Sequence, residues 1–237
     1  MLIRHPQPFK IGLMLAISFM GVLLLIFAPV FGDGKNGLEY SDDLFNKLSK
    51  GSSYFIPGIV KSNEGFLGKP FDLTVKMEKP GDVDKAVKVL MTGGAQVGTS
   101  EGALKVSGDI GKVLSSLLKD ADAMFRNNDN EVSTRYGMDA REVMRLWHDV
   151  LSRSIKELQK SKHIEEANMV NLVLKKAVEP AYNFFGIEAQ NIGDKALIVI
   201  ALLVFYVAYT MWWGYAIFYM FEGIGLSMKK AKVKKEV

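Results

Sequence analysis

The stretches IGLMLAISFMGVLLLIFAPVF (Ile11–Phe31) and ALIVIALLVFYVAYTMWWGYAIFYMF (Ala196–Phe221) decide the fold of this chain. Neither stretch contains Asp, Glu, Lys or Arg. Each is long enough to cross a hydrocarbon layer of ~30 Å as a helix, which takes roughly 20 residues. The sequence therefore predicts two transmembrane helices, over residues 11–31 and 196–222, with a hydrophilic segment between them.

Basic residues flank the predicted spans at the two ends of the chain. Arg4 and Lys10 precede the first span, and the tail over residues 223–237 is rich in lysine. Because Lys and Arg beside a span resist translocation, residues 1–10 and this tail are both expected in the cytoplasm. The tail lysines are expected at the membrane surface, where each adds about 1 kcal/mol of attraction to anionic lipid. They are Lys229, Lys230, Lys232, Lys234 and Lys235.

The charge distribution also indicates where the middle of the chain lies. The formal net charge is +4, but the segment between the spans is close to neutral. The positive charge is therefore a topology signal and does not indicate nucleic-acid binding. Residues 32–195 are expected to form a domain in the periplasm or an equivalent outer compartment, carried by a two-pass protein of the inner (cytoplasmic) membrane.

The first span has two interpretations. Its basic start and apolar run are also typical of a cleaved signal peptide. The run is longer than the usual h-region of about 7–15 residues, and Phe27–Phe31 offers no small-x-small cleavage site. We therefore expect a retained signal anchor. Since the chain has no cysteine, the outer domain must be stabilised by an ordinary hydrophobic core.

Period-2 and period-3.6 patterns predict a small α/β unit over residues 71–125. Apolar residues alternate with polar ones from Phe71 to Met77, which is typical of a strand with one wet face. Asp82 is expected to cap a short helix that Gly93 closes, and Asp109 is expected to start a longer one. Two brief strands are expected between these helices, at Ala95–Thr99 and Ala103–Ser107. The predicted order is β-α-β-β-α, which by itself assigns no function.

Two helices are expected after this unit. Asp139 and Glu142 form a capping box before a long apolar stripe, and a second helix follows to about Pro180, which ends or kinks it. This helical hairpin, over residues 139–180, either covers the sheet or packs on its own. Residues 32–58 are interpreted as a loop, or as a short helix around Asp42–Leu48. The predicted fold class is thus an α+β outer domain held by two transmembrane helices.

Several polar groups are candidates for chemistry, and each also has a structural interpretation. His148 lies between Trp147 and Asp149, where an imidazole beside a carboxylate suits acid–base work or metal binding. It has no second histidine at a ligand spacing, so we interpret it as a helix-surface residue. His163, in the connection between the two helices, is no better a candidate. The acidic clusters lack the EF-hand register and are interpreted as solvated turns. They are Asp120, Asp122, Asp129 and Glu131, and residues 33–39.

Glycine-rich sequence offers one further candidate. Residues 108–112 could bind an anion at a helix start, where free N–H groups point outward. The alternative is that these glycines serve turns and caps, and neither a P-loop nor a GxGxxG motif is present in the sequence. Without cysteine the chain has no thiol nucleophile. We therefore predict no catalytic residue, no metal ligand and no cofactor, and expect that the protein is not an enzyme.

The second span contains more aromatic and polar groups than an anchor needs. Tyr and Trp normally collect at the two membrane interfaces, but here they continue along the helix. Their N–H and O–H groups need partners in hydrocarbon. A second membrane protein, or another copy of this chain, would supply them; the alternative is a tilted single helix with a wide aromatic belt. The predicted partner-contact residues are Trp212, Trp213, Tyr215, Tyr219 and Glu222.

Three classes of function are compatible with this architecture. The first is a non-catalytic accessory, anchoring or scaffold subunit of an inner-membrane complex. The second is an extracytoplasmic sensor or ligand-binding module, which would signal through a partner because few residues follow the second span. The third, an outer-facing enzyme, lacks a convincing set of catalytic residues.

Overall fold

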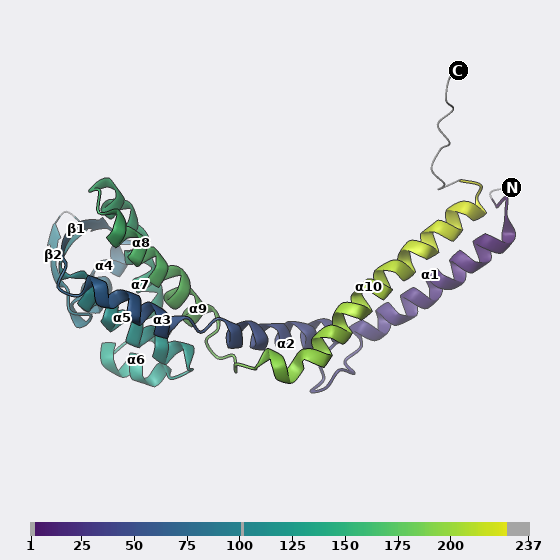
Figure 1. The fold of residues 1–237 in the computed structure, drawn as a ribbon, viewed down its shortest axis with the longest axis horizontal. Coiled ribbons are helices and arrows are strands. Elements are labelled where there is room, and N and C mark those ends of the chain that lie inside the picture. Colours follow the sequence, from purple (N-terminus) through teal and green to yellow (C-terminus); the bar gives the residue numbers. More distant parts are fainter. Residues whose placement is uncertain (1–2, 101, 227–237) are drawn as a thin grey trace, which may run out of the picture. The chain divides into compact units, whose positions relative to one another are not determined.

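The computed structural model describes residues 3–100 and 102–226, which form two compact units. One unit combines the chain up to Phe45 with the chain from Gln190 onward. The other is the segment Asn46–Ala189. Each unit is described separately, and Figure 1 labels their helices and the strands β1 and β2.

Two long apolar helices build the first unit. Helix α1 (Pro6–Phe27) and helix α10 (Ile192–Gly223) are each long and apolar enough to cross a membrane, and almost none of their residues are buried. They run antiparallel and side by side (Figure 1). The backbone N–H groups of Arg4 and His5 both donate to the Gly223 carbonyl, at 2.9 Å. The prediction of two apolar helices at the chain ends is confirmed, and both begin four or five residues earlier than expected, at Pro6 and Ile192.

Helix α2 (Gly37–Ser52) corrects the interpretation of residues 32–58 as a loop or short helix. The Asn36 Oδ1 accepts from the N–H groups of Leu38 and Glu39, both at 2.9 Å. In return the Glu39 carboxylate accepts from the Asn36 N–H at 2.9 Å. This reciprocal capping box satisfies the first free donors of the helix, and the Asn36-x-x-Glu39 spacing was the signal for it in the sequence. Glycine and serine in this helix obscured that signal, because both favour turns.

The second unit contains a three-stranded antiparallel sheet. Its order is β1-β3-β2, formed by β1 (Pro70–Lys76), β2 (Gln96–Ser100) and β3 (Ala103–Asp109). Leu73 of β1 and Val97 of β2 both pair with Val106 of the central strand. Along β1 and β3, buried apolar residues alternate with more exposed polar residues, so one face of the sheet is covered and the other faces solvent.

Helices and short helical turns make up the rest of this unit. Before β1 lie α3 (Ile56–Asn63) and the 3₁₀ turn η1 (Glu64–Phe66), and between β1 and β2 lie η2 (Pro80–Asp82) and α4 (Val83–Thr92). The elements that follow β3 are α5 (Ile110–Phe125), α6 (Asp129–Tyr136), α7 (Ala140–Lys160), α8 (Ile164–Val173), the π-helical turn η3 (Leu174–Val178) and α9 (Glu179–Asn183).

A single hydrophobic core joins the sheet to these helices. It contains side chains from β1 and β3 as well as from α3 through α9. Helix α7 packs directly against β1 and α4, with Trp147 fully buried at its centre. The helices over residues 139–180 therefore cover the sheet and do not pack as a separate hairpin, which decides between the two alternatives left by the sequence.

Asp82 has a different role from the one its position predicts. It occupies the N-cap position of α4, but its side chain makes no capping hydrogen bond. Both carboxylate oxygens instead accept from the Arg145 guanidinium of α7, at 2.9 and 3.1 Å. These hydrogen bonds hold the pKa of Asp82 below its usual value, against the opposing effect of burial. The residue therefore joins two helices far apart in sequence.

Pro180 is accommodated without ending the helical path. The chain leaves α8 through η3, whose wider π-type turn precedes α9 with Pro180 at its start. A proline removes one N–H donor and pushes against the carbonyl of the previous turn, and a π-helical turn relieves both effects. The helical structure therefore does not end at Pro180, which excludes one of the two outcomes expected from the sequence.

We predict that Gly93→Ala destabilises the second unit. A Cβ placed on Gly93 lies 2.7 Å from Cη2 of the buried Trp147 ring, so the ring must move. Overpacking of this kind costs about 1–3 kcal/mol. Gly58→Ala on α3 is the matched control, since no atom lies within 4 Å of its Cβ.

Urea unfolding of residues 46–189, followed through the fluorescence of Trp147, measures both variants. One cooperative transition is expected, at lower urea for Gly93→Ala and at an equal or higher concentration for Gly58→Ala. A gradual transition, or equal midpoints for Gly93→Ala and the parent, would contradict this account of the core.

Candidate functional site

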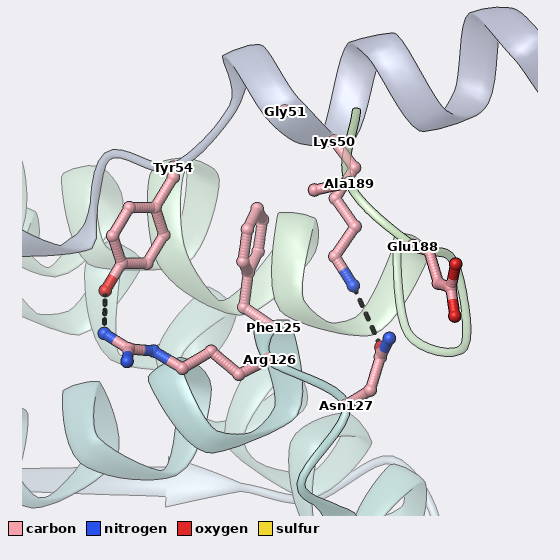
Figure 2. Close-up of a pocket in the computed structure, with 8 residues that line it drawn as sticks. All are labelled: Lys50, Gly51, Tyr54, Phe125, Arg126, Asn127, Glu188 and Ala189. Atoms are coloured by element: carbon pink, nitrogen blue, oxygen red, sulfur yellow. Dashed lines mark hydrogen bonds between the residues drawn. The ribbon is translucent and has the colours of Figure 1, made fainter. Parts of the chain in front are cut away.

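The second unit has a pocket at the end of α2, which Figure 2 shows in close-up. Its volume is about 620 Å³, within the range of small-ligand sites. Three segments distant in sequence form its wall: the end of α2, the end of α5 and the segment before α10. The lining residues are Lys50, Gly51, Tyr54, Phe125, Arg126, Asn127, Glu188 and Ala189.

A hydrogen-bond network around Lys50 holds these segments together. The Lys50 ammonium donates to Asn127 Oδ1 at 2.9 Å and to the Ile187 carbonyl at 2.6 Å. Asn127 in turn donates to the same carbonyl at 3.0 Å and accepts from the Gly186 N–H at 2.8 Å. Asn127 does this with a positive φ of 62°, a conformation that asparagine tolerates well.

The Lys50 side chain is buried although it is charged. The residue is 2 % exposed, and its ammonium lies 5.2 Å from the centre of the Phe125 ring. Burial lowers the pKa of Lys50 because water no longer solvates the charged form. No carboxylate pairs with Lys50 among the described residues, so uncharged oxygens and an aromatic face are its environment.

Tyr54 and Arg126 form the other side of the pocket. The Tyr54 hydroxyl donates to Asp122 at 2.6 Å. It also accepts from an Arg126 Nη at 2.6 Å (Figure 2). The pKa of Tyr54 is raised, first by burial and then by its hydrogen bond to the Asp122 carboxylate. The tyrosine ring also lies 5.3 Å from that of Phe125, so the two aromatic rings form a continuous apolar wall.

In the first unit, two glycines bring α1 and α10 into close contact. A Cβ on Gly12 of α1 would lie 2.6 Å from the Met220 backbone nitrogen and 2.9 Å from the Ala216 carbonyl. A Cβ on Gly223 of α10 would lie 2.5 Å from the Phe9 Cβ. Small residues that allow such backbone approach are typical of helix pairs in membranes.

Part of the aromatic set on α10 finds its partners on α1 of the same chain. The Trp212 indole N–H donates to the Leu15 carbonyl at 3.1 Å, and the Tyr209 hydroxyl donates to the Phe19 carbonyl at 3.2 Å. The Trp213 ring lies 4.8 Å from that of Phe19. From the sequence we argued that polar groups in hydrocarbon need hydrogen-bond partners. The indole N–H of Trp212 finds its partner within the hairpin.

The other predicted contact residues differ in how far they are covered. Tyr215 is 53 % exposed, and Tyr219 and Glu222 are partly exposed. The side chains of Tyr215 and Glu222 make no hydrogen bond or ion pair within residues 3–100 and 102–226. The five predicted membrane-surface lysines lie outside the described residues.

The structure places His148 on the surface of α7 and His163 at the N-cap position of α8, each beside a glutamate. His148 Nε2 lies 3.6 Å from Glu179, which also pairs with Lys175 at 2.6 Å. The His148 imidazole lines a second, smaller cavity of about 330 Å³ with Tyr182, next to the π-helical turn. His163 Nδ1 lies 3.8 Å from Glu166.

The acidic residues between α5 and α6 are not gathered into one site. Asp120 is 3 % exposed and accepts hydrogen bonds from the Tyr136 hydroxyl and from Arg135, the latter at 2.6 Å. Burial raises the pKa of Asp120, and its hydrogen bonds and the Arg135 charge oppose that rise. Asp120 is therefore a buried anchor between helices, and the interpretation of it as part of a solvated turn was wrong.

At residues 108–112, the candidate anion-binding position before α5 is filled by other groups of the protein. Asp109 caps the helix by accepting from the Lys112 N–H at 3.1 Å and also accepts from the Gly68 N–H at 2.9 Å. A Cβ on Gly111 would lie 2.5 Å from the backbone of Phe66. A carboxylate and a packed backbone thus fill the place where an anion would bind.

The Lys50 pocket was not predicted from the sequence. Lys50, Asn127 and Ile187 lie in separate segments of the chain. No residue spacing in the sequence indicates that they are in contact. A lysine in an amphipathic helix is expected to be exposed to solvent. The sequence therefore contains no pattern that predicts this site. No protein-family model, no curated protein and no solved structure matches the chain.

We predict that Gly12→Leu separates α1 from α10, whereas Gly21→Leu does not. A side chain at Gly12 meets the α10 backbone, but no atom lies within 4 Å of a Cβ at Gly21 on the same helix. Cysteines introduced at His5 and Ile224 report on the packing, because the chain has none of its own. A short bismaleimide should join the two ends in the parent and in Gly21→Leu.

After proteolysis of the middle segment, the joined halves migrate together on a denaturing gel. In Gly12→Leu the joined product should fall several-fold, as expected for about 1–3 kcal/mol of steric overlap. Equal cross-linking of the two leucine variants would show that the glycine contact does not hold the hairpin.

Proposed function

We propose that this chain is a non-catalytic accessory subunit of an inner-membrane complex, anchored by the α1–α10 hairpin and presenting residues 46–189 outside the cytoplasm. The observation that carries the proposal is the division of α10 into two faces. One face packs on α1 through Trp212 and Gly223, while Tyr215 stays exposed on another. We infer that a helix of a partner protein covers the exposed face.

The physical argument concerns polar groups in hydrocarbon. Water is absent there, so a Tyr hydroxyl or a Glu carboxylate gains from a protein partner. Interhelical hydrogen bonds of this kind contribute roughly 0.6–2 kcal/mol each. Gly214 lies next to Tyr215 with no atom within 4 Å of its Cβ position, which leaves room for a second helix to approach.

The proposed topology places both termini in the cytoplasm. Its support is the antiparallel hairpin, in which Arg4 and Gly223 lie at the same end, together with the basic residues of both tails. The middle segment then lies in the periplasm or an equivalent compartment. Within it we propose that residues 71–125 act as a β-α-β-β-α unit, with the later helices as its cover.

A second candidate function is an extracytoplasmic ligand-binding sensor. The observation that favours it is the Lys50 pocket, whose wall includes both ends of the 46–189 segment. Those ends continue along the chain into the hairpin, so a bound molecule would touch the two connections at once. Such a sensor would still act through a partner, so it shares the docking face of the first proposal.

We predict that both termini face the cytoplasm. A green fluorescent protein fused after Val237 should fluoresce, because it folds in the cytoplasm and fails to do so after export in unfolded form. Protease added to spheroplasts should cut within residues 32–195 and leave the fusion intact. A fusion that does not fluoresce, together with a middle segment protected from protease, would show the opposite topology.

We predict that Tyr215→Leu combined with Tyr219→Leu weakens lateral association and leaves the hairpin intact. Leucine keeps the helix apolar, so insertion should not change, whereas interhelical contacts of roughly 0.6–2 kcal/mol each should be lost. The matched control is Leu203→Ala with Val207→Ala on the same helix, which shortens two exposed apolar side chains without removing a polar group.

Chemical cross-linking in native membranes, followed by mild detergent extraction, measures the association. The tyrosine variant should lose cross-linked species that the parent and the control retain, while the His5–Ile224 cross-link of the hairpin remains. Retention of those species in the tyrosine variant would mean that this face contacts only lipid.

A further inference from the structure

The pocket at Lys50 contains a buried positive charge that no carboxylate of the described residues neutralises. The two acceptors of the ammonium, Asn127 Oδ1 and the Ile187 carbonyl, are uncharged. An ammonium has three N–H donors, so one remains for a further acceptor. Burying such a charge is unfavourable unless an anion or a complete set of hydrogen bonds compensates it.

A second cationic group lies in the same pocket. Arg126 donates through Nε to Asp122 at 3.2 Å and through Nη2 to Tyr54 at 2.6 Å. A guanidinium has five N–H donors in a planar fork, and its Nη1 makes no hydrogen bond within the described part of the chain. Arg126 is therefore able to support an acidic group bound near Lys50, although Asp122 already balances its charge.

The remaining wall is aromatic. The rings of Tyr54 and Phe125 lie 5.3 Å apart at an angle of 36°, and Figure 2 shows the Phe125 ring between Tyr54 and Lys50. Aromatic walls accept flat apolar groups through stacked or edge contacts. Glu188, exposed at the rim, adds a negative charge that disfavours ligands with two acidic groups.

We propose that this pocket binds a small aromatic monocarboxylate. The carboxylate accepts from the free N–H of Lys50, the ring lies against Tyr54 and Phe125, and Arg126 adds attraction for the acid. A bound molecule would contact the end of α2 and the 188–189 segment together. This site is independent of the docking face proposed for α10.

The test uses the full chain in phosphatidylcholine nanodiscs and the probe 4-fluorobenzoate, with 4-fluorobenzamide as its uncharged counterpart. Fluorine NMR line broadening measures binding, and empty nanodiscs correct for partitioning into lipid. A hydrogen bond to a charged group is worth about 1.5–3 kcal/mol, so the benzoate should bind about tenfold or more tightly than the benzamide. Equal binding, or no saturable binding of the benzoate, would overturn the proposal.

Variants locate the binding to the pocket. Lys50→Met should weaken benzoate binding about tenfold or more, whereas Lys61→Met, on the exposed face of α3, should not change it. Arg126→Gln, which alters an exposed side chain, should weaken it several-fold without affecting the fold. Benzoate binding that survives both Lys50→Met and Arg126→Gln places the probe elsewhere and refutes this site. The benzoate–benzamide comparison needs no substitution, so it decides the proposal even if Lys50→Met does not fold.

Discussion

The contact between α1 and α10 at Gly12 and Gly223 is the constraint on which the first unit depends. Two apolar helices gain little by meeting in hydrocarbon unless their backbones come close enough for many van der Waals contacts. The missing side chains at these two glycines allow that approach. Once the backbones are close, Trp212 and Tyr209 reach carbonyls of α1 that a wider spacing would leave out of range.

The same contact has a consequence for the segment between the helices. Because the hairpin is antiparallel, the chain leaves α1 and enters α10 at one end of the pair. Inside residues 46–189, the Lys50 network links the end of α2 to the 186–187 turn, so the first and last parts of that segment lie close together.

The core of that domain depends on long-range polar contacts as well as on apolar packing. Asp82 and Arg145 join α4 to α7, and Asp120 joins α5 to α6 through Tyr136. Each carboxylate is buried and would be costly there without its partner. These pairs fix how the helices lie on the sheet around Trp147, a geometry that apolar contacts alone specify less tightly.

Much of the fold was predictable because its signals are local. The apolar runs at the two ends predicted α1 and α10, and the capping box at Asp139 predicted the start of α7. Alternation from Phe71 to Met77 predicted β1. Where local signals compete, the prediction failed: glycine and serine masked α2 in spite of the box at Asn36 and Glu39.

Only the tertiary structure decided which polar groups meet. From the sequence, Lys50 is one of many lysines and Asp120 is one of a run of acidic residues, because neither spacing nor periodicity distinguishes a buried charge from a solvated one. The sequence by itself determined the two long apolar helices at the chain ends and the start of α7, since hydrophobicity and capping act over a few residues. The tertiary structure decided the Lys50 pocket, the Asp82–Arg145 pair and the two faces of α10, because each requires segments from distant parts of the chain to be brought within hydrogen-bonding distance.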